Sequence, residues 1–179
     1  LPQTELVKDK GYEILYFTDN VDEFAIRVLN EYNEKQFKSV SADDLDLDTD
    51  EKKEEIKAKE EESADLFKTL AEHLKGKVSR VKLSSRLKSH PVCITSEGEI
   101  SLEMEKVLNS MPSEQKVKAQ RILEINPDHP IFAKLNELYA NDKDKLGKYA
   151  ELLYNQALLI EGLPIENPAE FANLICELM

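Results

Sequence analysis

The sequence predicts an α/β (α+β) fold in which a small α/β subdomain is followed by a connecting helix, a three-stranded sheet with helices, and a terminal helical bundle. Three observations carry this prediction. Short runs typical of strands occur at 12–18, 35–41, 77–87, 91–96 and 121–126. A charged run with almost no apolar residue, 50–62, is typical of a solvated helical connector. Beyond residue 129, apolar residues recur at helical spacing to the end of the chain.

The first part predicts helix, strand, helix and strand in that order. Residues 3–10 favour a helix, and the almost continuous apolar run 12–18 predicts a strand buried on both faces. The next helix begins at Asp19 or Asn20 and carries an apolar stripe as far as Tyr32. A short second strand then completes a small α/β unit.

The second part begins where the apolar stripe resumes at 66–74, after the charged connector. Three strands follow, with a short helix at 100–111 between the second and the third. The remaining chain predicts three helices, at 129–140, 143–160 and 167–179. Asp128 is the expected cap of the first of these, and Asn167 with Pro168 and Glu170 resembles a capping box for the last.

Charge is strongly negative and unevenly distributed. The chain has 179 residues and a net charge of −12, which argues against a general grip on nucleic acid or anionic lipid. Residues 43–65 hold twelve acids and four lysines, whereas residues 75–90 hold six basic residues and no acid. A solvated face or an intramolecular partner is the favoured interpretation of the basic stretch, and an RNA site is the less favoured one.

The sequence shows no pattern of a membrane span or a signal peptide, which favours a cytoplasmic protein. No run of about 18 apolar residues predicts a membrane span, and the N-terminus has no apolar signal core. Cys93 and Cys176 lie in apolar surroundings, which favours reduced, buried thiols of a cytoplasmic protein. The chain lacks an initiator Met and begins within an apparent helix, so we expect a piece of a longer protein.

No catalytic constellation is recognisable. His73, His90 and His129 lack partners at metal-ligand spacing, and the chain has only five glycines for any phosphate-binding loop. Ser84 and Ser85 precede His90 without an orienting acid or oxyanion donors. The sequence therefore predicts no catalytic residue, no cofactor-binding residue and no metal ligand.

The two terminal helices are unusually apolar. Their stripes consist of Leu146, Ala150, Leu153, Ala157 and Ile160, and of Phe171, Leu174, Ile175 and Leu178. A small three-stranded unit has little surface with which to cover both helices, so pairing with the same helices of a second chain would bury the remainder. Packing within one chain is the alternative, and the pattern leaves both open.

The helix at 100–111 raises the same question. One face carries Ile100, Met104, Val107, Leu108 and Met111, including two of the chain's three methionines. Such a stripe is typical of core, and the residues alone favour core. Methionine is also flexible and polarisable, which suits a surface that accepts varied partners. Loop-like flanks suggest that this helix can move.

Several stretches together resemble the 90-kilodalton heat-shock chaperone family, and within it the bacterial high-temperature protein G type. In chain order they are KDKGYEILYFTDNVDEFAI, KQFKSVS, VSRVKLSSRLKSHPVCI, ILEINPDHPIFAKL and YAELLYNQALLIEGLPIENPAEFANLI. They span essentially the whole chain. The acidic run 43–65 is only generically similar.

The resemblance implies a division of the chain into two domains. Residues 1–60 would be the end of the middle domain, and residues 61–179 the C-terminal dimerisation domain. It implies a homodimer formed through 143–160 and 167–179, and a client-contact helix at 100–111 that binds non-native proteins. It thereby favours the partner-facing interpretation of the methionine face.

The resemblance also implies that ATP and Mg²⁺ bind upstream of this region, in a parent chaperone ATPase, so the fragment itself would not be an enzyme. The chain ends in CELM and lacks the acidic tail by which some relatives recruit helical-repeat co-chaperones. A stand-alone dimeric scaffold or adaptor without a chaperone cycle is the alternative function, and an RNA-binding module is a third.

Overall fold

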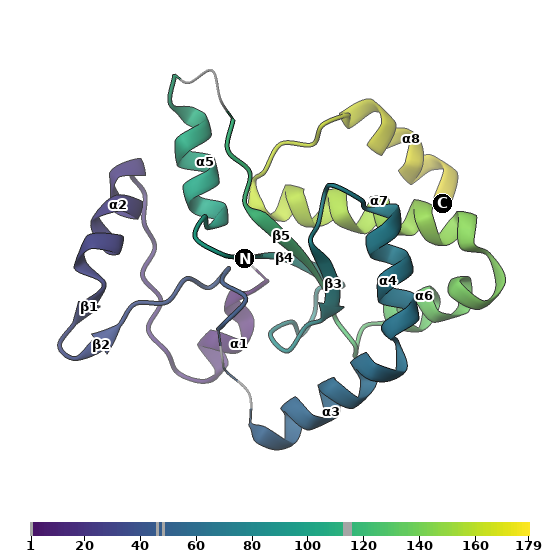
Figure 1. Ribbon diagram of the computed structural model, residues 1–179, viewed down its shortest axis with the longest axis horizontal. Coiled ribbons are helices and arrows are strands. Elements are labelled where there is room, and N and C mark those ends of the chain that lie inside the picture. Colours follow the sequence, from purple (N-terminus) through teal and green to yellow (C-terminus); the bar gives the residue numbers. More distant parts are fainter. Residues whose placement is uncertain (1, 46, 48, 113–115) are drawn as a thin grey trace.

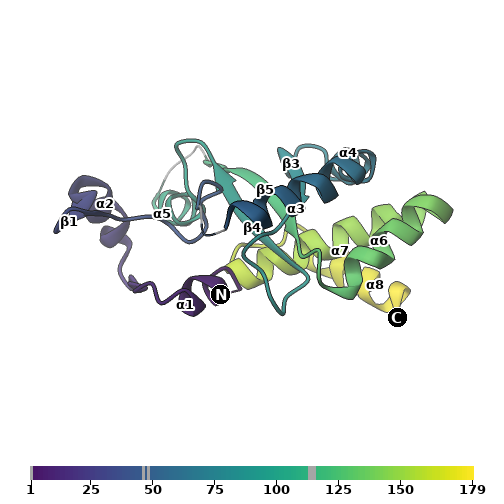
Figure 2. The ribbon, with the colours of Figure 1, turned by 90° about the horizontal axis from the view of Figure 1, so that it is seen from below.

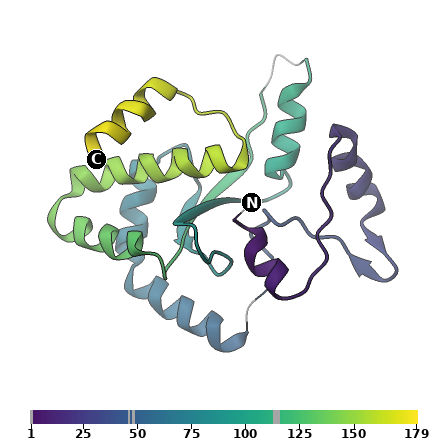
Figure 3. The ribbon, with the colours of Figure 1, turned by 180° about the vertical axis from the view of Figure 1, so that it is seen from behind.

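The computed structural model describes residues 2–45, 47, 49–112 and 116–179. Asp46 and Asp48 of the acidic run, and the middle of the loop expected after the 100–111 helix, lie outside the described residues. A small sheet stands at the centre, with α2 (Asn20–Leu29) at one end of the molecule and the last helices at the other (Figures 1 and 3). The predicted mixture of helices and small sheets is confirmed.

The first part differs from the prediction in its strands. After α1 (Thr4–Asp9), residues 12–18 form no strand and leave several of their large side chains exposed. The predicted second strand is reduced to β2 (Lys35–Gln36), which pairs only with β1 (Glu31–Tyr32) in a tight hairpin. The prediction of a buried strand at 12–18 was wrong because a strand needs a neighbouring strand, and the described chain offers this segment none.

α2 begins where the sequence places it. Asp19 and Asp22 form a reciprocal capping box with the backbone of the first turn. The helix ends at Leu29 rather than Tyr32, because Asn30 has a φ of +54° and turns the chain into the hairpin. None of its residues is buried in the described structure.

The connector is a helix, as predicted. α3 (Asp50–Glu62) buries none of its residues, and the side chain of its cap Thr49 accepts a hydrogen bond from the amide of Lys52. α4 (Ala64–His73) follows directly and turns Leu66, Phe67 and Leu70 into the core. One apolar cluster forms before the connector, around Leu6, Val7 and Leu47, and the main core forms after it.

The three-stranded sheet of the second part is confirmed. The central strand β5 (Gln120–Ile125) pairs in parallel with β3 (Arg80–Leu83) and antiparallel with β4 (Val92–Glu97). Leu83 lies opposite Ile125 in one ladder, and Val92 lies opposite Ile125 in the other. Because β4 and β5 are buried along most of their length, both faces of the sheet are covered.

Helices cover the sheet and complete the core. α7 (Lys143–Glu161) packs along β4, α4 packs on β3, and α6 (Pro130–Asn141) packs against α7. α8 (Pro168–Leu178) lies outside α7, where Figure 2 shows it at the edge of the molecule. The predicted cap of α6, Asp128, was wrong. The helix is capped by His129, whose Nδ1 accepts from the amide of Ile131 at 3.1 Å.

Asn126 holds the end of β5 against the loop before β4. It is fully buried, and its Nδ2 donates to the carbonyls of Lys88 at 3.1 Å and His90 at 2.9 Å. Its Oδ1 accepts from the amide of Asp128 at 3.0 Å. A single amide side chain therefore satisfies three backbone groups.

We expect Asn126→Ala to lower the free energy of unfolding by about 1–3 kcal/mol, because a fully buried side chain is removed and three partly buried backbone groups lose their partner. Asn141→Ala is the matched control. Its side chain is exposed and bonds only the carbonyl of Glu137, so the change should stay within about 0.5 kcal/mol. Urea unfolding followed by circular dichroism measures both, and equal losses would contradict the assignment.

Candidate functional site

The methionine helix, α5 (Leu102–Ser110), is shorter than predicted. Ser101 caps it by accepting from the amide of Met104 at 3.0 Å, and Met111 follows its last turn. Met104 and Val107 are buried, Ile100 and Leu108 are half-buried, and Met111 is 42% exposed. Of the five residues predicted to contact clients, Met111 at the C-terminal end is the most exposed, and Met104 and Val107 are buried.

α2 lies beside α5, so a segment far away in sequence helps to enclose the methionine helix (Figures 1 and 2). Arg27 donates to the carbonyl of Glu99 at 3.1 Å and to the hydroxyl of Ser101 at 3.3 Å. That hydroxyl donates in turn to Glu23 at 2.9 Å. The start of α5 is thereby tied to α2.

The inner side of α5 is polar and buried. Glu105 accepts from a guanidinium nitrogen of Arg121 on β5 and from the amide of Ala119 at 2.9 Å. A second nitrogen of Arg121 donates to the hydroxyl of Tyr154 on α7 at 2.7 Å. Burial alone lowers the pKa of Arg121, but the hydrogen bonds and charges of Glu105 and Tyr154 together outweigh burial and raise the pKa, so the guanidinium stays charged.

Sequence reasoning missed a second apolar surface around α2. Large side chains exposed over this region are Tyr12, Leu15, Tyr16, Phe17, Val21, Phe24, Val28, Leu29 and Tyr32. The sequence did contain the apolar residues that form this surface, since the run 12–18 is apolar on both faces and α2 carries a clear apolar stripe. What the sequence did not reveal is that the described chain leaves this surface uncovered. Its nearness to α5 makes it part of the same candidate surface.

The apolar stripe of α7 is enclosed by its own chain. Leu146, Ala150, Leu153 and Ala157 belong to the main core, while Ile160 is half-buried. The expectation that the small sheet could not cover this helix was wrong, because β4, α4 and α6 all pack on it. Excess apolar surface therefore no longer argues that these four side chains meet a second chain.

The apolar stripe of α8, unlike that of α7, is not enclosed by the described chain. α8 buries none of its residues: Phe171, Leu174 and Leu178 are half-buried, and Ile175 is 36% exposed. Among the described elements α8 packs mainly on α7. Between the two helices lies a groove of about 530 Å³, lined by Gly147, Tyr154, Phe171 and Leu174 together with charged side chains.

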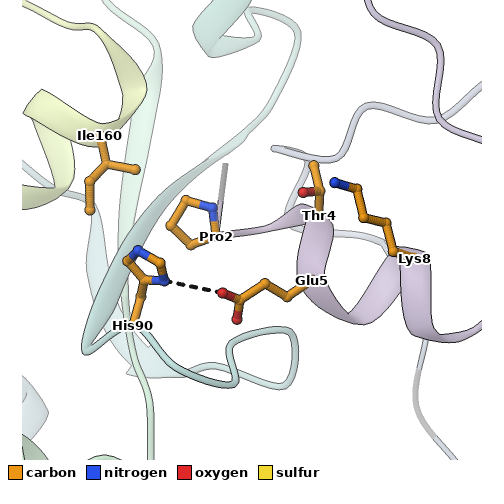
Figure 4. Close-up of a pocket in the computed structure, with 6 residues that line it drawn as sticks. All are labelled: Pro2, Thr4, Glu5, Lys8, His90 and Ile160. Carbon is orange, nitrogen blue, oxygen red and sulfur yellow. Dashed lines mark hydrogen bonds and ion pairs between the residues drawn. The ribbon is translucent and has the colours of Figure 1, made fainter.

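α1 docks beside the loop before β4 and forms a shallow pocket with it (Figure 4). Glu5 accepts from the amides of Lys88 and Ser89, both at 3.2 Å, and lies 3.2 Å from Nδ1 of His90. Burial alone raises the pKa of Glu5, but the donors of Ser89, Lys88 and His90 outweigh it and lower the pKa. These partners make Glu5 an anchor for α1.

The basic stretch 75–90 is occupied by partners within the chain. Ion pairs join Lys77 to Glu151, Arg80 to Asp43 and Glu97, Lys82 to Asp43 and Glu124, Arg86 to Glu124, and Lys88 to Asp9. The intramolecular interpretation of this stretch therefore accounts for these residues. The backbone of Asp43 also lies beside the edge strand β4, where its amide donates to the carbonyl of Ser96 at 3.1 Å.

Both cysteines are free thiols, but only one is buried. Cys93 lies in β4, and burial raises the pKa of its thiol well above the ordinary value. Cys176 is exposed on α8, so the prediction of two buried thiols was half wrong. Over the described residues, no three His, Cys, Asp or Glu side chains group as a metal site, and none of the helices offers an apolar stretch of the length that a bilayer span requires.

Over the described residues, exposed apolar helix faces stand out more than any cluster of reactive side chains. The family model described as Hsp90 protein matches residues 1–179. The chain belongs to the Hsp90 family, which confirms the resemblance found in its motifs.

Relatives in this family are bacterial chaperones. The chaperone protein HtpG of Clostridium acetobutylicum is 62% identical over all of this chain, which covers 28% of that protein. The chaperone proteins HtpG of Bacillus velezensis and Bacillus subtilis are 58% and 56% identical over all of this chain, which covers 29% of each. The chain thus spans less than a third of the length of these relatives.

The cluster at Asp43 yields a test of how the segment before the connector is held. Burial alone raises the pKa of Asp43, but Lys82, Arg80 and Arg86 outweigh it and lower the pKa. The carboxylate therefore contributes stability above its unfolded pKa of about 3.9, and this contribution is lost as the pH falls through the folded pKa.

We expect Asp43→Asn to lower the unfolding midpoint at pH 7, and the gap to the parent to close below pH 4 as the parent's own Asp43 becomes protonated. Asp44→Asn is the control, because Asp44 makes an exposed pair with Lys38. Urea midpoints measured from pH 3 to pH 7 provide the comparison. A gap that does not vary with pH would show that the charge of Asp43 is not what matters.

Proposed function

We propose that this chain is the C-terminal part of an ATP-dependent Hsp90-family chaperone, in which it joins two subunits and offers contact surface to non-native client proteins. Its membership of the family, together with chaperone relatives that match all of its length, is the observation that carries the proposal. Residues 1–60 are proposed as the end of the middle domain and residues 61–179 as the dimerisation domain. We propose a cytoplasmic location.

The dimer is proposed to form through α8 and the outer face of α7. α8 has an apolar stripe but no buried residue, and Leu159 on α7 is also exposed. Burying such a side chain stabilises an interface by about 1.5–3 kcal/mol, so a twofold mate that covers this stripe would gain substantially. Leu146, Ala150, Leu153 and Ala157 would act indirectly, by fixing α7 on the sheet.

We expect Ile175→Asp to raise the dimer dissociation constant by at least about tenfold, because a carboxylate would be buried without a partner. Its circular dichroism spectrum should change little, since Ile175 is partly exposed within one chain. Sedimentation equilibrium of the 179-residue chain measures the constant.

Asn173→Asp is the matched control, because it adds the same charge at an exposed residue about 200° around the helix. If both variants leave the dissociation constant at the parent value, α8 does not form the interface.

Client contact is proposed for the open end of α5 and the neighbouring apolar surface of α2. Met111 and half-buried Leu108 lie at the end of the methionine stripe, and exposed aromatic side chains lie over the adjacent segment 12–32. Flexible and aromatic apolar groups suit partners of varied sequence. Met104 and Val107 are buried in this conformation and are proposed to join this surface only when α5 opens, while Ile100 packs against the main core.

We expect Leu108→Ser with Met111→Ser to weaken client holding by about threefold or more, because apolar contact area is lost. The melting temperature should fall little, since neither side chain is fully buried. Suppression of the thermal aggregation of a model client, measured by light scattering, reports the effect.

Met179→Ser is the control, because it removes a methionine that is exposed at the end of the chain. If the double variant holds the client as well as the parent chain does, α5 is not part of the client surface.

Nucleotide chemistry is proposed for the parent protein and not for this fragment. In the described part of the chain, acids and histidines do not gather into a group that fits Mg²⁺, so no step involving ATP is derived from these residues. The proposal involves no nucleic acid, no membrane and no helical-repeat co-chaperone bound through an acidic tail. A stand-alone dimeric scaffold or adaptor is the alternative, and a gene without an upstream nucleotide-binding domain would favour it.

A further inference from the structure

Three elements meet at one buried guanidinium. Arg121 on β5 bonds to Glu105 on α5 and, at 2.7 Å, to the hydroxyl of Tyr154 on α7. Arg121 and Glu105 are both buried, and so is Tyr154. The second oxygen of Glu105 accepts the amide of Ala119 at 2.9 Å. The methionine helix is thus linked to the long terminal helix through a single side chain of the sheet.

This link is strong because it lies away from water. A buried carboxylate without its cation either takes up a proton or moves toward solvent, since an unpaired charge in a low-dielectric interior is costly. α5 is nine residues long. At its far end, Asn109 bonds to Val117 at 2.7 and 2.9 Å, Lys116 donates to the carbonyl of Asn109 at 2.9 Å, and Asn20 on α2 donates to the hydroxyl of Ser110 at 3.4 Å. These bonds lie at the last turn and do not involve Glu105.

Other contacts of α5 do not replace this one. Lys106 lies 3.5 Å from Glu161 at the end of α7, a looser pair with a half-buried lysine. Arg27 and Glu23 hold the start of α5 from the side of α2, through partly exposed side chains. Leu102 anchors the first turn in the core. Between these points, Glu105 is the charged residue of α5 that is buried against the sheet.

We propose that Arg121 is the positioning residue of the client-contact helix: by holding Glu105 and Tyr154 together it fixes α5 against the sheet and couples its position to α7. This inference rests on the proposed function, in which α5 contacts clients and α7 supports the dimer. Because β5 is the central strand, Arg121 provides a rigid point between the two helices. A shift of α7 would reach α5 through this side chain.

The test compares Arg121→Met with the double variant Glu105→Gln and Arg121→Met, both in the 179-residue chain. Hydrogen exchange measured by mass spectrometry reports the amides of 102–110 directly. Arg121→Met should accelerate their exchange on the order of tenfold, because α5 opens to solvate Glu105. The double variant should restore most of the protection, because the amide side chain introduced by Glu105→Gln is uncharged and can still accept from Ala119.

Lys68→Met is the control, because it removes an exposed cation from α4 and should leave exchange in α5 unchanged. If Arg121→Met does not fold, Tyr154→Phe tests the link to α7. It removes the hydroxyl and should accelerate exchange in α5 by about threefold, with Tyr149→Phe on the same helix as its control. Unchanged exchange in α5, or acceleration that the double variant does not reverse, would overturn the proposal.

A client assay separates this inference from the proposed function. Arg121→Met should weaken the suppression of client aggregation, and the double variant should restore it. If exchange responds as expected while client holding responds neither to Arg121→Met nor to Leu108→Ser with Met111→Ser, the client role of α5 fails. The positioning of α5 by Arg121 would then stand on the exchange data.

Discussion

The packing of α7 on a sheet of only three strands is the constraint from which the rest of the second part follows. α7 packs along β4, and its side chains Leu146, Ala150, Leu153 and Ala157 join apolar residues of the sheet in the main core. α8 folds back on α7, and none of its own residues is buried.

Unlike α8, α5 lies between two parts of the chain: the sheet with α7 on one side, and α2 on the other. Its inner side meets β5 and α7 through the buried hydrogen bonds of Arg121, while its first turn is joined to α2 by Arg27 and Glu23. The segment before the connector is fixed to the sheet by Asp43 and the basic residues of β3. Charge thus holds the parts together, while apolar stripes remain at the surfaces where partners are proposed to bind.

The sequence predicted local structure well where the chain supplies its own partners. The continuous apolar runs became β4 and β5, the charged run became an unburied connector, and Asn167 caps α8 as expected, with its side chain accepting from the amide of Glu170. Periodicity identified the apolar faces of α5, α7 and α8. It did not show what covers them, because the same stripe suits the core of one chain or the surface of a second.

The features that the sequence did not predict correctly also depend on partners from elsewhere in the fold. The run 12–18 has every property of a buried strand except a neighbour, and a strand without a neighbour does not form. The pair of Glu105 and Arg121 left no trace in the sequence, since the two residues are 16 positions apart in different elements. An acid in an amphipathic helix ordinarily faces solvent. Only the fold reveals that this one faces an arginine of the central strand.

We propose that the apolar stripe of α8 is covered by a second copy of the chain. Light scattering coupled to size-exclusion chromatography, at low micromolar concentration of the unmodified chain, tests this most directly. We expect a particle of twice the chain mass of 20.5 kDa. A single species with the mass of one chain would contradict it.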